Sequence, residues 1–185
     1  MVLMMICAGA SELAMAQWAS SFAEKAIGSS ELKWLSDLLG PCLFAICMGS
    51  TRVYYAKMSE KIDLTKGILI SSVICIISYL ITILSPYPAL SLFGCALCGI
   101  GAGIMWPGSF SIGSEKLPNG GVLMFGLLAL SGDFGCLVGP SLAGQISALF
   151  GDDLRAGFAV SLVFPIILAI IAAIMFFKKR RANKQ

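Results

Sequence analysis

The chain has 185 residues, of which 58% are hydrophobic and only 12% are charged, and its formal net charge is +3. A mean hydropathy of +0.90 excludes an ordinary water-soluble domain, and so few charges argue against nucleic-acid binding. The composition therefore predicts an all-α, polytopic membrane protein.

Six apolar stretches, each about 20 residues or longer, have the length needed to cross a bilayer. They run approximately from Met1 to Phe22, Asp37 to Ala56, Gly67 to Leu84, Ala89 to Ile112, Gly121 to Phe150 and Ala156 to Phe177. We expect a single domain, residues 1–185, built as a six-helix bundle. The first stretch contains Ala14-Met15-Ala16, which resembles a signal-peptide cleavage site, but no basic segment precedes it and Glu12 interrupts it. It is therefore predicted to be the first helix.

Four polar or proline-containing segments separate the first five spans. Glu24 to Ser36 and Lys57 to Lys66 are predicted loops. Ser85 to Pro88 and Leu117 to Gly121 are predicted tight turns, because proline and paired glycines do not continue a helix. Loops this short make consecutive helices antiparallel neighbours and leave no room for a soluble catalytic domain.

The basic residues are distributed unequally between the two sides of the membrane. If both termini lie inside, ten face the cytoplasm, namely Arg52, Lys57, Lys61, Lys66, Lys116, Lys178, Lys179, Arg180, Arg181 and Lys184. Three lie outside, namely Lys25, Lys33 and Arg155. Because positively charged loops stay in the cytoplasm, we expect both termini there and the protein in the plasma (cytoplasmic) membrane. Arg52 is expected to extend its side chain toward the nearby interface, and the final basic cluster to anchor the last helix to lipid headgroups.

Glu12 and Asp133 are the acidic residues that lie deep inside apolar helical stretches. Each is about 11 residues from the cytoplasmic end of its span, which at 1.5 Å per residue places it ~16 Å deep, near the middle of the bilayer. A carboxylate there is costly and usually functional, because it can exchange a proton or accept hydrogen bonds from a polar solute. The alternative is structural pairing with Ser, Gln or Trp donors on neighbouring helices.

Gln17, Trp18 and Trp106 are further candidates for binding a polar ligand. Gln17 and Trp18 follow Glu12 by one to two helical turns, and Trp106 lies in the fourth span. An amide and an indole supply directional hydrogen bonds, and an indole also supplies a stacking face. Packing or interfacial positions explain the two tryptophans equally well.

Small residues predict close helix contacts in the fourth and fifth spans. Gly99 and Gly103 form a G-x-x-x-G pattern, which lets another helix approach the backbone. The fifth span contains GLLALSGDFGCLVGPSLAG, in which the spaced positions are Gly126, Gly135, Gly139, Pro140 and Gly144. Chance in a glycine-rich membrane chain is the competing explanation. All seven cysteines fall within spans, where we expect them to pack as small apolar residues rather than form disulfides.

The fifth-span pattern resembles the glycine-proline motif of major facilitator superfamily transporters. The order of loops is similar to one six-helix half of that family, with Ala56-Lys-Met-Ser-Glu60-Lys61 as a degenerate counterpart of its charged motif. The first span, from Gly9 through Glu12 to Trp18, resembles the seventh helix of the sugar-transporting, fucose-permease-like branch.

This resemblance implies that the chain is the C-terminal half of a twelve-helix transporter. Such a half would move a small polar solute, a sugar or related metabolite with possible proton coupling, together with an N-terminal half or a second copy. The chain begins inside a span, which suggests part of something larger or a truncated gene product. The alternative function is a truncated, non-transporting membrane scaffold. No enzyme, metal centre or cofactor is expected, since the chain has no histidine, G-x-S-x-G or Walker loop.

Overall fold

The structure is a computed structural model and describes residues 1–27, 33–58 and 63–182. Throughout these residues the regular structure is helical. The helices are α1 (Val2–Ile27), α2 (Lys33–Met58), α3 (Leu64–Leu84), α4 (Pro88–Lys116), α5 (Gly121–Leu149), α6 (Leu154–Ser161) and α7 (Val163–Ala182).

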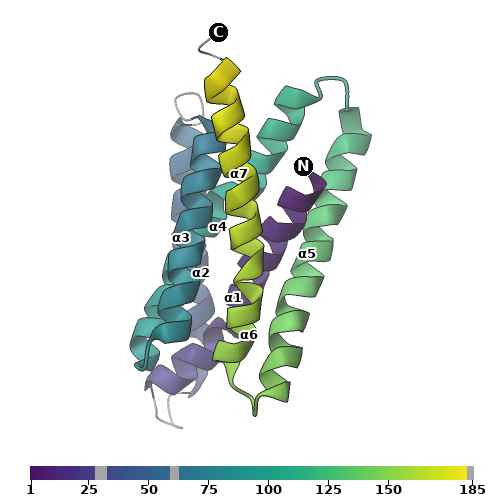
Figure 1. Ribbon diagram of the computed structural model, residues 1–185. Coiled ribbons are helices and arrows are strands. Elements are labelled where there is room, and N and C mark those ends of the chain that lie inside the picture. The colour runs from purple at the N-terminus through teal and green to yellow at the C-terminus, as the bar shows by residue number, and fades with distance from the viewer. Residues whose placement is uncertain (28–32, 59–62, 183–185) are drawn as a thin grey trace.

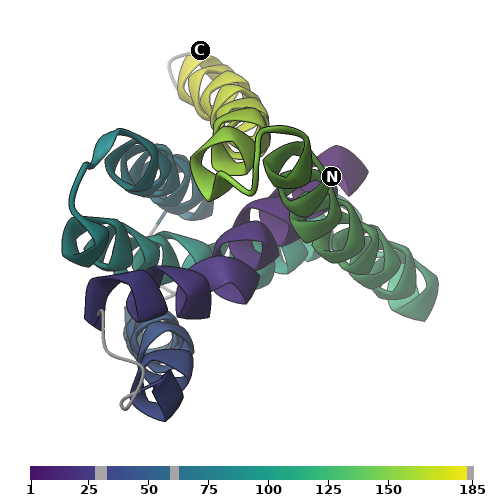
Figure 2. The ribbon, with the colours of Figure 1, turned by 90° about the horizontal axis from the view of Figure 1, so that it is seen from below.

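The helices form one elongated bundle in which both chain ends lie toward the same end (Figure 1). Seen along the bundle, α1 crosses its centre, and the other helices surround it (Figure 2). α1 accordingly contacts α2, α4, α5, α6 and α7, while α3 packs mainly against α4 and α7. The arrangement places the residues of α1 where several helices converge.

Most predicted elements are present, but the helices extend beyond the apolar stretches. The loop predicted from Glu24 to Ser36 is wrong at both ends, because α1 continues to Ile27 and α2 begins at Lys33. Residues 28–32, and residues 59–62 of the next predicted loop, lie outside the described part of the chain. Helical backbone needs no apolar side chains to satisfy its hydrogen bonds, so charged helix formers prolong a span into the interface. The two predicted tight turns are confirmed.

Five helical stretches of the described chain are long and apolar enough to cross a membrane. They lie in α1, α3, α4, α5 and the combined α6–α7 stretch. The second predicted span, from Asp37 to Ala56, is helical within α2 but is not among these five stretches. The chain is thus an integral, multi-pass membrane protein with five stretches of clear spanning character.

The last predicted span is interrupted where α6 ends at Ser161 and α7 begins at Val163. Pro165 explains the interruption, because it has no N–H to donate to the carbonyl of Ser161 and its ring crowds that carbonyl. Leu162 nevertheless donates its N–H to Phe158 and accepts from Ile166, so the chain direction continues.

Tyr79 of α3 joins the centre of the bundle. Its side chain is fully buried, its hydroxyl donates to the Ser11 carbonyl of α1 at 2.9 Å, and its ring meets Phe158 of α6 edge-on at 5.9 Å. Cys95 and Cys98 of α4 are also fully buried in this core, as expected for packing residues. These contacts fix α1 beside α3, α4 and α6.

Candidate functional site

Glu12 of α1 forms an ion pair with Arg52 of α2. The Glu12 Oε1 atom lies 3.7 Å from the Arg52 Nη2 atom, and the glutamate side chain is 14% exposed while that of the arginine is 45% exposed. The second carboxylate oxygen of Glu12, Oε2, is buried and has no hydrogen-bond partner among the described residues. One oxygen of the carboxylate is therefore paired with a cation, and the other is buried without a hydrogen-bond donor among the described residues.

This pair corrects the expected orientation of Arg52. The residue lies six positions before the end of α2, about 9 Å along the helix axis, and its side chain was expected to extend toward the interface. It instead approaches the carboxylate of Glu12. A buried carboxylate without a counter-charge costs several kcal/mol, so pairing is favoured over full exposure of the guanidinium.

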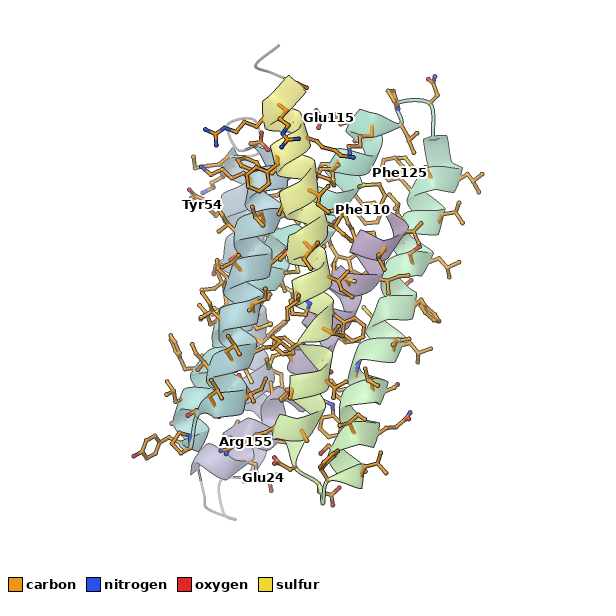
Figure 3. The ribbon with its side chains drawn as sticks, viewed as in Figure 1. Glu24, Tyr54, Phe110, Glu115, Phe125 and Arg155 are labelled. Atoms are coloured by element: carbon orange, nitrogen blue, oxygen red, sulfur yellow. The ribbon has the colours of Figure 1, made fainter. Side chains whose placement is uncertain are left out.

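A cavity of about 540 Å³ adjoins Arg52 and is walled mainly by aromatic side chains. Its lining residues are Arg52, Tyr55, Ala56, Trp106, Pro107, Phe110 and Ser111. The aromatic surface continues from Trp106 through Phe110 to Phe125, with ring centroids 6.2 and 5.9 Å apart. Phe110 and Phe125 project into the space between α4 and α5 (Figure 3). The cavity thus combines a cationic end with flat apolar walls, a combination typical of small-molecule sites.

Trp106 holds an unused hydrogen-bond donor at this cavity. Its indole N–H is buried without a partner among the described residues. Its ring packs over Gly132 of α5, where an added Cβ would lie 2.6 Å from the ring atom Cη2. Trp106 lies ten residues before the end of α4, about 15 Å along the axis, a depth similar to that of Glu12. The missing side chain at residue 132 therefore makes room for the indole.

The remaining predicted site residues do not join this cavity. Trp18 lines a second cavity, of about 600 Å³, with Ser21, Glu24, Gly144, Ser147, Asp152 and Leu154 near the other end of the bundle, where Glu24 lies (Figure 3). Gln17 and Asp133 are exposed, and no hydrogen bond or ion pair of Asp133 is found among the described residues. Glu12 and Asp133 therefore have different surroundings.

The fifth-span glycines also divide into different environments. Gly135 and Gly139 face the backbone of α1, where an added Cβ would overlap the carbonyl oxygens of Ile6 and Ala10. Gly144 faces the ring of Trp18, and Pro140 is buried beside this contact. Gly126 has no atom within 4 Å of an added Cβ.

Arg52, Tyr55 and Phe110 were missed by the sequence analysis as site residues. Tyr55 approaches Ser111 of α4, with 3.5 Å between the two hydroxyl oxygens. The available signal was spacing: Arg52 and Tyr55 are three residues apart and share one face of α2. That face could have been paired with Glu12 only if the packing of α1 against α2 had been known.

Membrane-length helices that hold a carboxylate–guanidinium pair beside an aromatic cavity define a multi-pass membrane protein with a polar intramembrane site. Such sites are characteristic of transporters. The chain belongs to the major facilitator superfamily, whose sequence profile matches residues 1–185. This family transports small solutes across membranes. No curated protein sequence matches the chain significantly.

Proposed function

We propose that the chain binds a small polar solute, a sugar or related metabolite, at the cavity beside Glu12 and Arg52 and takes part in moving it across the membrane. The observation that carries this proposal is the Glu12–Arg52 ion pair: Arg52 lines the aromatic cavity, and Glu12 behind it keeps one buried carboxylate oxygen without a partner among the described residues. An ionisable residue kept inside a membrane indicates a substrate or ion pathway.

The chemistry of the cavity favours a hydroxylated ring. The Glu12 carboxylate accepts hydrogen bonds from hydroxyl groups, whereas the Arg52 guanidinium and the Trp106 indole donate to their oxygens. The rings of Tyr55, Trp106 and Phe110 supply flat apolar surface for the C–H face of a sugar. A wholly apolar solute would leave the ion pair unused, and a simple inorganic ion would leave the aromatic walls unused.

Coupling to protons follows from the charge of the pair. With Glu12 ionised, the pair is neutral overall, and its guanidinium is held by the carboxylate. Protonation of Glu12 removes that attraction and leaves Arg52 as an uncompensated cation. The two protonation states would therefore bind a polar solute differently, as a proton-coupled symporter requires.

We also propose that this unit works with a second six-helix unit, either an N-terminal half or another copy. A rocking transporter holds its solute at the interface between two bundles, near the bilayer midplane. The described chain leaves Gln17, Asp133 and many apolar side chains exposed, so it has surface available for a partner. The chain alone, as a monomer, should bind solute but should not transport it.

Ligand titration in lipid nanodiscs tests the binding proposal without requiring transport. The intrinsic tryptophan fluorescence of the purified chain is measured against a hexose, a polyol and a neutral amino acid. We expect saturable quenching by the hexose, and a roughly tenfold or greater loss of affinity in Glu12→Gln, since a charged hydrogen bond contributes ~1.5–3 kcal/mol. Glu115→Gln, at the end of α4, removes the same charge outside the cavity and should bind normally.

No saturable response to any hydroxylated solute, or equal affinity in Glu12→Gln and the unaltered chain, would contradict the proposed site. The coupling proposal has a separate test in liposomes that contain the complete transporter. Uptake should depend on the proton gradient in the unaltered protein and should lose that dependence in Glu12→Gln.

A further inference from the structure

A third cavity, larger than the other two, is a groove between α2 and α3, over α4. It encloses about 690 Å³, which is within the ~300–1,000 Å³ of typical small-molecule sites. Its apolar walls and floor are formed by Ile46, Ile70, Ile74, Ile100, Ile104 and the ring of Tyr54. It is separate from the cavity beside Arg52, with which it shares no lining residue.

The groove faces the hydrocarbon of the membrane. Ile46 and Ile70 on its rims are 63% and 50% exposed, and further apolar side chains such as Val73 and Ile77 are exposed along α3. α4 separates the groove from the solute cavity, because Ile100 and Ile104 face one and Trp106 and Phe110 face the other. An occupant of the groove would therefore come from the lipid rather than from the solute pathway.

The interior of the groove offers few free hydrogen-bonding groups. The hydroxyl of Ser50 donates to the Ile46 carbonyl at 2.7 Å, and that of Thr51 donates to the Cys47 carbonyl at 3.0 Å. A peptide segment would have to bury its own N–H and C=O groups there without hydrogen-bond partners, which is strongly unfavourable. A hydrocarbon chain has no such groups and carries no such cost.

The groove opens at one end beside Lys66, whose ammonium group has no carboxylate partner among the described residues. Lys66 lines this end, is exposed, and forms no ion pair within the described part of the chain. The nearby carboxylate of Asp63 is already engaged, since it accepts from the backbone N–H groups of Thr65 and Lys66 and lies 2.9 Å from the Lys179 Nζ atom. Asp63 and Lys66 both line this mouth, so it presents a carboxylate that is already paired and an exposed ammonium group that has no ion-pair partner among the described residues.

We propose that this groove binds an anionic phospholipid, with an acyl chain along the isoleucines and the headgroup phosphate on the ammonium group of Lys66. The ligand must be apolar over the length of the groove and negative at its mouth, and it must reach the site from the bilayer. Basic residues at a pocket between transmembrane helices recognise anionic headgroups in this way. The exposed ring of Tyr54 at the same end is suited to the headgroup level of the membrane.

Native mass spectrometry of the full chain tests this site. The protein is released from vesicles that contain equal amounts of phosphatidylglycerol and phosphatidylcholine with the same acyl chains. We expect selective retention of phosphatidylglycerol, and a loss of about fivefold in Lys66→Gln, which corresponds to the ~1 kcal/mol that a basic residue contributes near an anionic surface. Lys116→Gln is the matched control, because it removes the same charge from the end of α4 outside the groove.

A second variant tests the acyl-chain part of the groove. Ile70→Trp fills the groove and leaves Lys66 in place. It should lower the retention of phosphatidylglycerol, and an unchanged circular dichroism spectrum shows that the variant is folded. Equal retention of the two lipids by the unaltered chain would overturn the proposal, as would an equal loss in Lys116→Gln. Displacement of the lipid by millimolar inorganic phosphate would also overturn it, because it would indicate a simple anion site.

Discussion

The contact between α1 and α5 depends on two glycines whose replacement by alanine should destabilise the bundle. An added Cβ at Gly135 would overlap the carbonyl oxygen of Ile6, and one at Gly139 would overlap that of Ala10. Both obstacles are backbone atoms of α1, so no side-chain rotation relieves the overlap. Because ordinary contact begins at 3.4 Å, the two helices would have to move apart.

The expected cost combines two opposing effects. Forcing extra volume into a packed contact costs ~1–3 kcal/mol, whereas Gly→Ala in a helix gains up to ~1 kcal/mol in helix propensity. Because the obstacle at Gly139 is backbone, we expect the upper part of this cost, ~2–3 kcal/mol, and a net loss for Gly139→Ala of about 1–2 kcal/mol. Gly126→Ala in the same helix meets no atom within 4 Å, so only the favourable propensity term remains. The two variants should change stability in opposite directions.

Thermal unfolding in detergent, followed with a thiol-reactive dye, measures the difference. Buried thiols such as Cys7, Cys75, Cys95 and Cys98 become reactive only when the bundle opens. We expect the midpoint for Gly139→Ala to fall by about 2–8 °C and that for Gly126→Ala to stay level or rise. Equal midpoints for Gly139→Ala and Gly126→Ala would refute the assignment of the α1–α5 contact.

Three further predictions concern charge. Arg52→Gln should lower the unfolding midpoint, because it removes the counter-charge of Glu12. Adding Glu12→Gln to this variant should recover part of the loss. Purely additive effects of the two substitutions on stability would argue against the ion pair. Burial alone would raise the pKa of Asp63. Its pKa is nevertheless lowered below its ordinary 3.8, because the carboxylate accepts hydrogen bonds from Lys179 and from the backbone N–H groups of Lys66 and Thr65 and is attracted by the charge of Lys179. The ionised Asp63 therefore stabilises the fold above pH 3.8, and this stabilisation is lost as the pH falls through the lower pKa of the folded state. The unfolding midpoint of the unaltered chain should drop over this pH range. Asp63→Asn should remove the part of the drop that Asp63 causes. A reporter that is active only in the cytoplasm should be active when fused after Gln185, and activity only of an external reporter would reverse the expected topology.

The sequence predicted the helices and turns well because hydrophobic length and proline act locally. The turn from Ser85 to Pro88 appears where expected, since a helix cannot continue through its two prolines. Helix ends were predicted less well: α4 continues to Lys116, four residues beyond the apolar stretch that ends at Ile112. Hydropathy locates the part of a helix that lies in hydrocarbon, whereas the helix itself ends where its backbone hydrogen bonds end.

The candidate site was only partly predictable, because its residues come from different helices. Burial of Glu12 in apolar surroundings could be inferred from its neighbours along the chain. Its partner could not, since Arg52 is 40 positions away and the pairing depends on how α1 crosses α2. The same limit applies to Trp106, whose contact with Gly132 depends on the approach of α4 to α5. Single-sequence patterns identify such residues but do not bring them together.

α4 shows how small residues allow one helix to serve the proposed solute and lipid sites together. Its glycines face neighbouring backbones, with Gly99 against Phe44 of α2 and Gly101 against Ser71 of α3. Because α4 has no side chain at these two positions, α2 and α3 approach it closely enough to form the walls of the isoleucine groove. The bulky residues of α4 are left for its free faces, with Ile100 and Ile104 toward lipid and Trp106 and Phe110 toward the polar cavity. A larger residue at position 99 would therefore push away α2, which lines both sites, and would disturb both although it would touch neither ligand.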